Sequence, residues 1–239
     1  MKNSARSGSL FHYTREFDFL KSILKNGFYP RYCLEHTSLF FQSPTKSAFP
    51  MVCFCDIPLS RSSRHTGDFG EYGIGVKKEW AIRNKANPVI YLSQESTILN
   101  DFRVLIGQDE DSFEVAHASY GLLGHTKPLS VSGTGGELEE FHQECEWRYV
   151  PEIRRDHINS FLKEEAFNDE KLIEENQALL AQHYSVAIQA TEITSIIVKT
   201  DSEIEEAIDF LKGLENFTKS EIDLLLTRIS SFESINRDY

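Results

Sequence analysis

Hydrophobic residues recur with two different periods along the chain, and their spacing predicts helices in some segments and strands in others. Between Phe17 and Leu24 the apolar positions repeat every three or four residues, so a short amphipathic helix is expected there. Asn26 and Gly27 follow directly, and glycine readily adopts the left-handed conformation that ends many helices. The sequence therefore predicts that this helix ends at Asn26 and Gly27.

Short apolar or alternating runs predict the strands. The run from Val52 to Ile57 is apolar except for Asp56, and Pro58 ends it. From 144 to 150 polar and apolar residues alternate, as they do in a strand with two different faces. The full set of expected strands is 52–57, 72–76, 88–92, 144–150 and 193–198.

Helical patterns dominate the second half of the chain. Segments 95–107 and 159–183 are expected to be helical, and Ser202 opens an acidic helix. Thr218 and Glu221 have the spacing of a capping box, which predicts the start of a further helix. Helices and strands mixed in this way indicate an α+β fold.

Length and composition fit one large folded domain. The chain has 239 residues, 40% of them hydrophobic, which is enough to bury a full core. No stretch approaches the roughly 20 apolar residues that cross a bilayer, and the start lacks the apolar segment of a secretory signal. A cytoplasmic protein without membrane contact is therefore expected. The four scattered cysteines suit buried thiols better than disulfides.

The charge of the chain is strongly acidic. A net charge of −12 at pH 7 disfavours broad, non-specific binding to nucleic acid. The acidic excess lies mainly in 164–175 and 201–223, which are expected to be solvated helix surfaces or, alternatively, a surface for a basic partner. A local basic groove remains compatible with this average and would supply phosphate contacts. Its expected lining is Arg61, Arg64, Lys77, Lys78 and Arg148.

One short segment carries candidate chemistry. Glu144, Glu146 and Arg148 fall on one face of the expected strand 144–150, and Trp147 lies on the other. Two carboxylates this close raise the pKa of one of them unless a cation relieves the repulsion. Two interpretations stay open, namely carboxylates that share a cleft and an exposed edge strand on which Arg148 neutralises both.

Other motifs are weaker. Gly70-Glu-Tyr-Gly-Ile-Gly75 has the reverse of the glycine spacing in a dinucleotide-binding fingerprint. Cys53 and Cys55 are too close for the usual spacing of zinc ligands, so no metal is expected. His12, taken alone, fits a satisfied core or surface histidine as well as a site residue.

Several segments together resemble a known family. They are Phe11-His-Tyr-Thr14, Val52-Cys-Phe-Cys-Asp-Ile-Pro-Leu-Ser60, His65, Tyr72-Gly-Ile-Gly75, Lys78-Glu-Trp80 and Glu146-Trp-Arg-Tyr-Val-Pro151. This set resembles the AbiGi-type abortive-infection family of phage-defence proteins over about residues 9–200. A His-x-Thr strand end before a short helix, with a late Glu-x-Glu strand, is also similar to the layout of DarT-like and diphtheria-toxin-like ADP-ribosyltransferases.

The resemblance implies a fold and a co-substrate. The fold would be an ADP-ribosyltransferase-like two-sheet core over residues 1–200 with peripheral helices, and residues 201–239 would form a helical tail packed on it. NAD would be the co-substrate. Loss of nicotinamide builds positive charge on the ribose, and a carboxylate aimed at that ribose stabilises this charge.

The resemblance also implies residue roles. Glu146 matches the catalytic glutamate, and Glu144 matches the position that orients the acceptor. NAD would be held by His12 and Thr14 on the first strand and by Tyr72 as the stacking aromatic. Tyr13 and Tyr91 are the alternatives for the stacking role, and His65 is a further contact. The residues implied in target binding are Arg61, Arg64, Arg148 and Gly135, the last in the glycine-rich loop 132–137.

The function that follows is a phage-defence toxin that transfers ADP-ribose from NAD to a macromolecule. Nucleic acid, either RNA or DNA, is preferred to protein as the target, and an antitoxin or chaperone-type partner is expected to restrain the toxin. The alternative is a non-catalytic antitoxin, with the same shell, that covers a partner toxin. The joint presence of His12, Thr14 and Glu146 favours the enzyme, because a degenerate site would have lost at least one of them.

Overall fold

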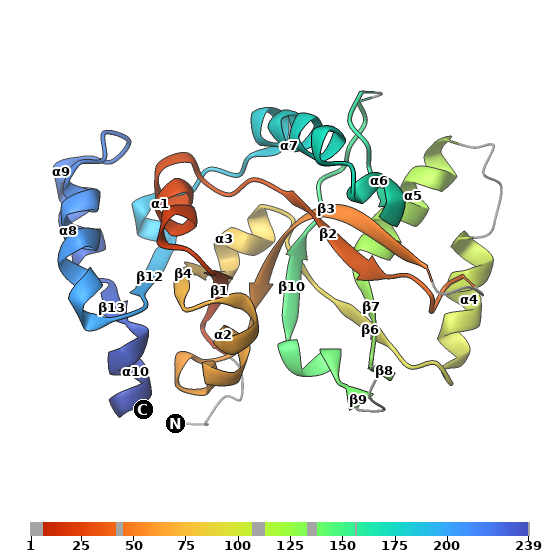
Figure 1. The fold of residues 1–239 in the computed structure, drawn as a ribbon, viewed down its shortest axis with the longest axis horizontal. Helices are drawn as coiled ribbons and strands as arrows, with labels where there is room; N and C mark the ends of the chain where they lie inside the picture. Colours follow the sequence, from red (N-terminus) through yellow and green to blue (C-terminus); the bar gives the residue numbers. More distant parts are fainter. Residues whose placement is uncertain (1–6, 42–44, 107–112, 133–137, 156, 239) are drawn as a thin grey trace. The chain divides into compact units, whose positions relative to one another are not determined.

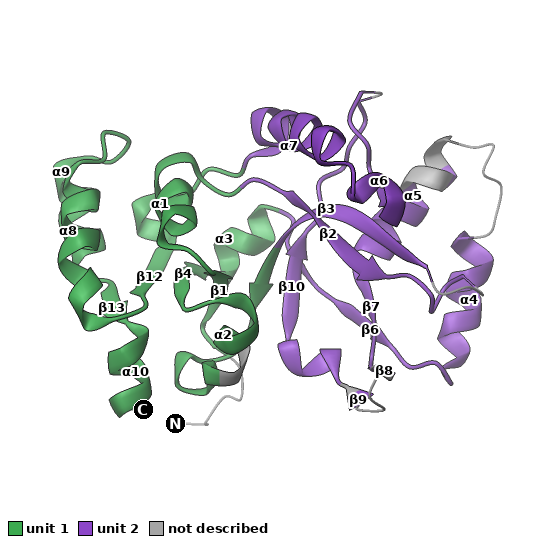
Figure 2. Ribbon diagram, in the orientation of Figure 1, with its two compact units in different colours: residues 1–28, 53–84, 186–239 green, residues 29–52, 85–185 purple. Residues whose placement is uncertain are grey.

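The computed structural model describes residues 1–239 except 1–6, 42–44, 107–112, 133–137, 156 and 239 (Figure 1). The chain forms two compact units, shown separately in Figure 2. Unit 1 consists of residues 1–28, 53–84 and 186–239, and unit 2 of residues 29–52 and 85–185. Both units combine strands with helices, so the predicted α+β class is confirmed. The expected domain boundary at residue 200 stays a prediction.

The sheet of unit 1 is built on the first strand of the chain. Its strands are β1 (Ser9–Thr14), β4 (Tyr72–Lys77), β12 (Ile193–Val198), β13 (Ile229–Ser231) and the end of β3 (Lys46–Cys55). β4 lies antiparallel between β1 and β12, and β13 runs parallel to β12. Gly75 on β4 allows this close pairing, because a Cβ there would lie 2.8 Å from the ring of Phe11.

The helices of unit 1 follow the predicted patterns where apolar spacing was clear. They are α1 (Phe17–Asn26), α2 (Ser63–Phe69), α3 (Lys78–Arg83), α8 (Ile204–Lys212), α9 (Lys219–Leu226) and α10 (Phe232–Asp238), with 3₁₀ turns η1 (Leu59–Arg61), η3 (Ala190–Glu192) and η4 (Asp201–Glu203). α1 buries Leu20, Ile23 and Leu24 and ends at Gly27, which has φ +80°. α9 begins with the predicted capping box of Thr218 and Glu221.

The core of unit 1 joins the two ends of the chain. Phe11, Tyr13 and Cys55 pack with Ile197 of β12 and with Phe232 and Ile235 of α10. β1 alternates, so His12 lies on the opposite face from Phe11 and Tyr13. There it meets the rings of Phe28 and Phe54, at 5.5 and 5.9 Å between centroids.

Unit 2 contains the strands that carry the candidate chemistry. They are β2 (Arg31–His36), the first part of β3, β5 (Asn87–Pro88), β6 (Ile90–Leu92), β7 (Thr126–Pro128), β8 (Val131–Ser132), β9 (Leu138–Glu139), β10 (Glu146–Tyr149) and β11 (Leu162–Lys163). β2 pairs antiparallel with β3, β10 with β5, and β6 parallel with β7. The single strand expected over 88–92 is in fact two. The N–H of Val89 donates to Glu146 on β10, whereas that of Ile90 donates to His125 beside β7.

The helices of unit 2 are α4 (Thr97–Ile106), α5 (Phe113–Gly124), α6 (Glu164–Phe167) and α7 (Glu170–Tyr184), with the 3₁₀ turn η2 (Phe141–Glu144). The helix expected over 159–183 is broken, because Asp169 caps α7 by accepting from the N–H of Leu172. α7 packs on β2 and β3, where Leu180 meets Tyr32 and Ala48 (Figure 1). Across the described residues, no helix combines the length and the apolar character needed to cross a membrane.

Gly70 is a strict backbone requirement of unit 1 and gives a stability prediction. Its φ is +111°, and a Cβ there would lie 2.0 Å from the carbonyl oxygen of Thr14. We expect Gly70→Ala to lower the free energy of unfolding by more than about 1 kcal/mol, because neither the conformation nor the contact accepts a side chain. Denaturant unfolding monitored by circular dichroism measures this loss. The matched control is Gly67→Ala within α2, where a Cβ meets nothing within 4 Å; equal midpoints for the two variants would contradict the prediction.

Candidate functional site

The candidate site of unit 2 starts at β10, where burial alternates along the strand. Glu146 is 7% exposed and Arg148 is 0% exposed, whereas Trp147 and Tyr149 are half-buried. The prediction that Glu146 and Arg148 share a face is confirmed, and that face is the more buried one. The interpretation of an exposed edge strand is wrong, because the Arg148 guanidinium lies inside the unit.

Arg148 binds both carboxylate oxygens of Glu146 through one edge of its guanidinium. Its Nε donates to Glu146 Oε1 at 2.8 Å, and its Nη2 donates to Glu146 Oε2 at 2.9 Å. The same Nη2 lies 2.9 Å from Oε1 of Glu35 on β2, and Nη1 donates to the carbonyl of Gly124 at 3.0 Å. A fork of this kind fixes both the position and the charge of the carboxylate. Glu146 is therefore held in one orientation.

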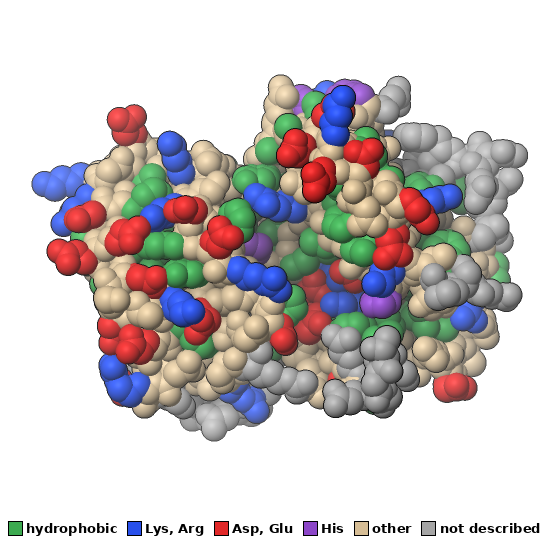
Figure 3. All heavy atoms as spheres, in the orientation of Figure 1, with side chains coloured by type: hydrophobic (Ala, Val, Ile, Leu, Met, Phe, Trp, Pro, Cys, Tyr) green, Lys and Arg blue, Asp and Glu red, His purple; other side chains and the backbone are tan. Residues whose placement is uncertain are grey.

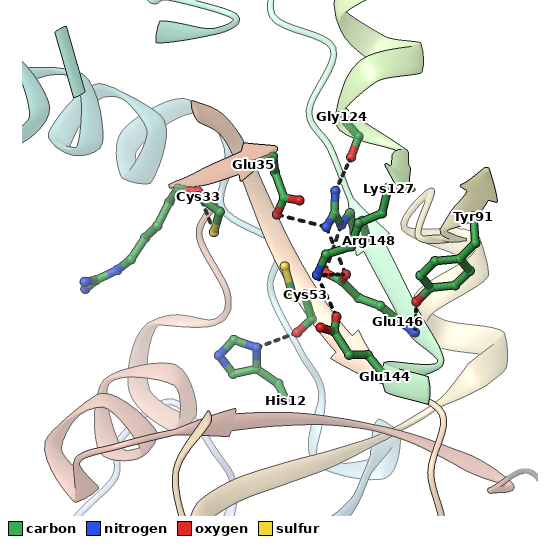
Figure 4. A network of polar contacts seen from close by, with 11 residues as sticks. His12, Cys33, Glu35, Cys53, Tyr91, Gly124, Lys127, Glu144, Glu146 and Arg148 are labelled. Carbon is green, nitrogen blue, oxygen red and sulfur yellow. Dashed lines mark hydrogen bonds and ion pairs between the residues drawn. The ribbon is translucent and has the colours of Figure 1, made fainter. Parts of the chain in front are cut away.

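Glu144 does not lie on the strand, although it was expected there. It ends the turn η2, and Cys145, with φ +46°, separates it from β10. This left-handed residue breaks the alternation. The two carboxylates nevertheless converge, because Nζ of Lys127 on β7 lies 2.7 Å from Glu144 Oε2 and 3.5 Å from Glu146 Oε2. Figure 4 shows these side chains pointing toward one another.

Five side chains thus form what we call the charged cluster, namely Glu35, Lys127, Glu144, Glu146 and Arg148. Burial, together with the charge of Glu146, raises the pKa of Glu144 to about 7, although Lys127 opposes this shift. Burial by itself would lower the pKa of Lys127, but the surrounding carboxylates raise it above its usual range. The expected repulsion between two neighbouring glutamates is therefore present, and cations relieve it only in part.

Sequence reasoning missed Lys127 and Glu35. Both are single charged residues in short strand segments, and nothing in the local pattern links them to β10. In the sequence, each appears only as a charged residue within a short stretch of strand character. Such residues also occur on exposed strands, so they do not indicate a site. The pairing of β2 with β3 and of β6 with β7 brings them to the site.

The expected NAD contacts on β1 lie in unit 1 and have partners within it. Nδ1 of His12 lies 2.7 Å from the carbonyl oxygen of Cys53, and the hydroxyl of Thr14 donates to the carbonyl of Glu16 at 3.0 Å. Tyr13 is a buried core residue. The side chains of His12 and Thr14 thus contact backbone carbonyls of unit 1.

The remaining predicted residues lie on β4, η1 and α2 of unit 1 and, for Gly135, within the range of unit 2. Tyr72 pairs with Thr14 across β1 and β4, stacks on Phe17 at 5.5 Å, and donates its hydroxyl to Glu203 at 2.7 Å. Arg61 is exposed on η1. Arg64 and His65 belong to α2, but their side chains are outside the described part of the chain, as is the whole of Gly135.

Two cations of the expected basic groove are paired with carboxylates. Lys78 lies 2.8 Å from the buried carboxylate of Asp56, and Arg148 is enclosed in the charged cluster. In Figure 3 acidic and basic side chains are interspersed over the face in view. Among the described residues, no group of three or more His, Cys, Asp or Glu side chains is arranged to hold a metal ion. Cys55 is buried, and Cys33, Cys53 and Cys145 are half-buried thiols.

Comparisons with known proteins place the charged cluster inside a matched region. Residues 26–199 match a family model described as "Putative abortive phage resistance protein AbiGi, antitoxin". The chain is also 28% identical to the "Abortive phage resistance protein AbiGi" of Lactococcus lactis subsp. cremoris, over 255 aligned positions that cover 89% of this chain and 99% of the relative. No solved structure matches. The family match includes all five residues of the charged cluster, whereas His12 and Thr14 precede it.

The pair of Arg148 and Glu146 leads to a second stability prediction. Arg148→Met leaves Glu146 and Glu35 buried without this cation, and loss of one partner from a buried pair costs about 3–5 kcal/mol. The double variant Arg148→Met with Glu146→Leu is expected to be more stable than the single one, because it removes the more buried of the two carboxylates that lose this cation. Free energies of unfolding in urea test both statements.

The control is Arg154→Met, since Arg154 pairs with Glu152 where both side chains are at least half exposed. Such a pair contributes about 0–1 kcal/mol. Equal losses of unfolding free energy in Arg148→Met and Arg154→Met would show that the buried pair contributes no more to stability than the exposed pair.

Proposed function

The chain belongs to the AbiGi family of abortive phage resistance proteins, and we propose that it acts in phage defence as an antitoxin that binds and restrains a toxic partner. The observation that carries this proposal is the match of residues 26–199 to a family described as an antitoxin. The relative from Lactococcus lactis, which aligns over nearly its whole length, supports the role in phage resistance.

The state of Glu146 supports a binding role over a catalytic one. A carboxylate that stabilises a cationic ribose must present its negative charge to the substrate. Here both oxygens of Glu146 accept from Arg148, and its side chain is 8% exposed. The charge is thus already balanced inside unit 2. In this proposal the charged cluster holds β2, β7 and β10 together.

The acidic character of the chain indicates the chemistry of the partner. The net charge is −12, and α8 exposes Glu205, Glu206 and Asp209. Charge complementarity gives specificity and fast association between proteins of opposite charge. The proposed partner is therefore a protein toxin with a basic surface, such as one that acts on nucleic acid.

A second function, transfer of ADP-ribose from NAD, is favoured by one observation on Glu144. This carboxyl is the most exposed acid of the charged cluster, at 18%, and its pKa is raised to about 7. A group that titrates near neutral pH is suited to proton transfer. In this second proposal Glu144 and Glu146 are the acting carboxylates, NAD supplies the ADP-ribose, and nucleic acid is the preferred target.

The fit of NAD to the predicted contacts is mixed. Glu144 offers a carboxyl that is partly accessible. The contacts of unit 1 are already in use, because Nδ1 of His12 contacts one backbone carbonyl and the hydroxyl of Thr14 donates to another. One face of Tyr72 is covered by Phe17. On binding, NAD would either leave these contacts in place or replace them with its own. The transferase proposal consequently depends more on the glutamates than on the residues of unit 1.

Growth experiments separate the two proposals, because a toxin and an antitoxin have opposite effects when expressed alone. An antitoxin leaves growth unchanged when expressed in a host without its native gene neighbours. Deletion of its gene from the native locus then arrests growth, and expression of the chain from a plasmid restores it. A transferase instead arrests growth when expressed alone, and labelled ADP-ribose passes from NAD to cellular macromolecules.

Glu144→Gln is the variant that decides the second proposal. It keeps the size of the side chain and lies on a turn rather than in the core, so the protein is expected to fold; circular dichroism checks this. Loss of both toxicity and labelling in Glu144→Gln supports the transferase, with nuclease and protease treatment identifying the labelled target. Growth arrest by the isolated chain, retained in Glu144→Gln and without labelling, would count against both proposals.

A further inference from the structure

The charged cluster contains more negative than positive side chains. Among the described residues it has three carboxylates, of Glu35, Glu144 and Glu146, and two cations, of Lys127 and Arg148. Their side chains are between 0% and 18% exposed. Buried charge without a counter-charge is strongly unfavourable. The geometry therefore favours uptake of one proton by the cluster.

The two cations give the three carboxyls different environments. Arg148 is committed to Glu146 through two hydrogen bonds and to Glu35 at 2.9 Å. In the described part of the chain, Lys127 is the cation in contact with Glu144, and it also lies within 3.5 Å of Glu146. Glu144 thus depends on Lys127, whereas Glu146 and Glu35 both have contacts with Arg148.

Lys127 also holds the turn that carries Glu144. Its Nζ lies over the ring of Phe141 at 4.5 Å from the centroid, and it bonds to Glu144 at 2.7 Å. Phe141 and Glu144 are the two ends of η2. One side chain of β7 therefore contacts both ends of the turn and the first residue of β10.

We propose that Lys127 is a positioning residue of the charged cluster, which ties Glu144 to Glu146 and weakens the hold of Glu144 on the proton that the cluster takes up. This inference concerns the cluster itself and holds for either proposed function. The raised pKa of Glu144 agrees with it, since burial and Glu146 drive that pKa upward and Lys127 limits the rise.

The charged and titratable groups around Glu144 come from several strands. Glu35 is on β2, Tyr91 on β6, Lys127 on β7, and Glu146 and Arg148 on β10. Burial raises the pKa of Tyr91, so its hydroxyl stays protonated and accepts from the N–H of Glu146 at 3.0 Å. Close by, burial lowers the pKa of His125, which keeps this imidazole neutral. Neither of these two groups therefore replaces Glu144 as the group that takes up the proton.

The sign of the pH dependence follows from the raised pKa. A folded carboxyl that binds its proton more tightly than the unfolded chain contributes stability at low pH. For Glu144 this contribution is complete below about pH 4.5 and is lost as the pH rises through about 7. The stability of the wild type relative to Glu144→Gln should therefore fall between pH 5 and pH 8.

A titration of the purified chain tests the proposal without either activity. Glutamate labelled with ¹³C at the carboxyl carbon is followed by NMR between about pH 4 and 9. In the wild type one carboxyl is expected to titrate near pH 7, and this signal disappears in Glu144→Gln. Lys127→Met should move its midpoint upward by at least about 1 pH unit, because a contacting cation is lost. Lys127→Arg keeps a cation and should restore the midpoint.

The matched control is Lys163→Met, an exposed lysine of the same unit, which should leave the midpoint unchanged. The proposal fails if the titration near pH 7 persists in Glu144→Gln, or if Lys127→Met leaves the midpoint where it was. Should Lys127→Met not fold, the dependence of stability on pH in wild type and Glu144→Gln decides, since equal curves between pH 5 and 8 would also overturn it. Failure of the antitoxin or the transferase proposal changes none of these readings.

Discussion

The buried ion pair of Arg148 and Glu146 is the interaction on which unit 2 depends. A guanidinium with no exposed surface must find a partner for its charge and its donors inside the protein. It finds them on Glu146, on Glu35 and at the carbonyl of Gly124, so β10, β2 and the end of α5 must meet at this point. Lys127 adds β7 to the same set. The packing of the unit is thus specified by charge as well as by apolar contact.

The same pair also limits the chemistry available to Glu146. A carboxylate that accepts from a guanidinium at both oxygens is well positioned but has little charge left to offer a substrate. Glu144 binds the ammonium group of Lys127, and its side chain is 18% exposed. The two glutamates, equivalent in the sequence pattern, therefore have different environments. Glu146 is suited to hold the unit together, whereas Glu144 is suited to exchange a proton or a contact.

The sequence predicted most of what depends on local pattern. The helix from Phe17, the capping box at Thr218 and the shared face of Glu146 and Arg148 follow from spacing alone, and the structure has them. The split at Val89 and the position of Glu144 could not be predicted. The split at Val89 arises because the residues before and after it pair with different strands. The position of Glu144 depends on the left-handed backbone of Cys145. Lys127 and Glu35 reach the site by long-range pairing, which no window of sequence contains.

A buried cluster of charges needs a reason other than stability. Apolar side chains of similar volume would often hold the same strands together as well or better. In an antitoxin the reason would be specificity, because charges that must be paired permit few alternative arrangements of β2, β7 and β10. In a transferase the reason would be chemistry at Glu144, the most exposed carboxyl of the charged cluster. The two explanations therefore assign different roles to Glu144, which is a packing contact in the first and an acting carboxyl in the second.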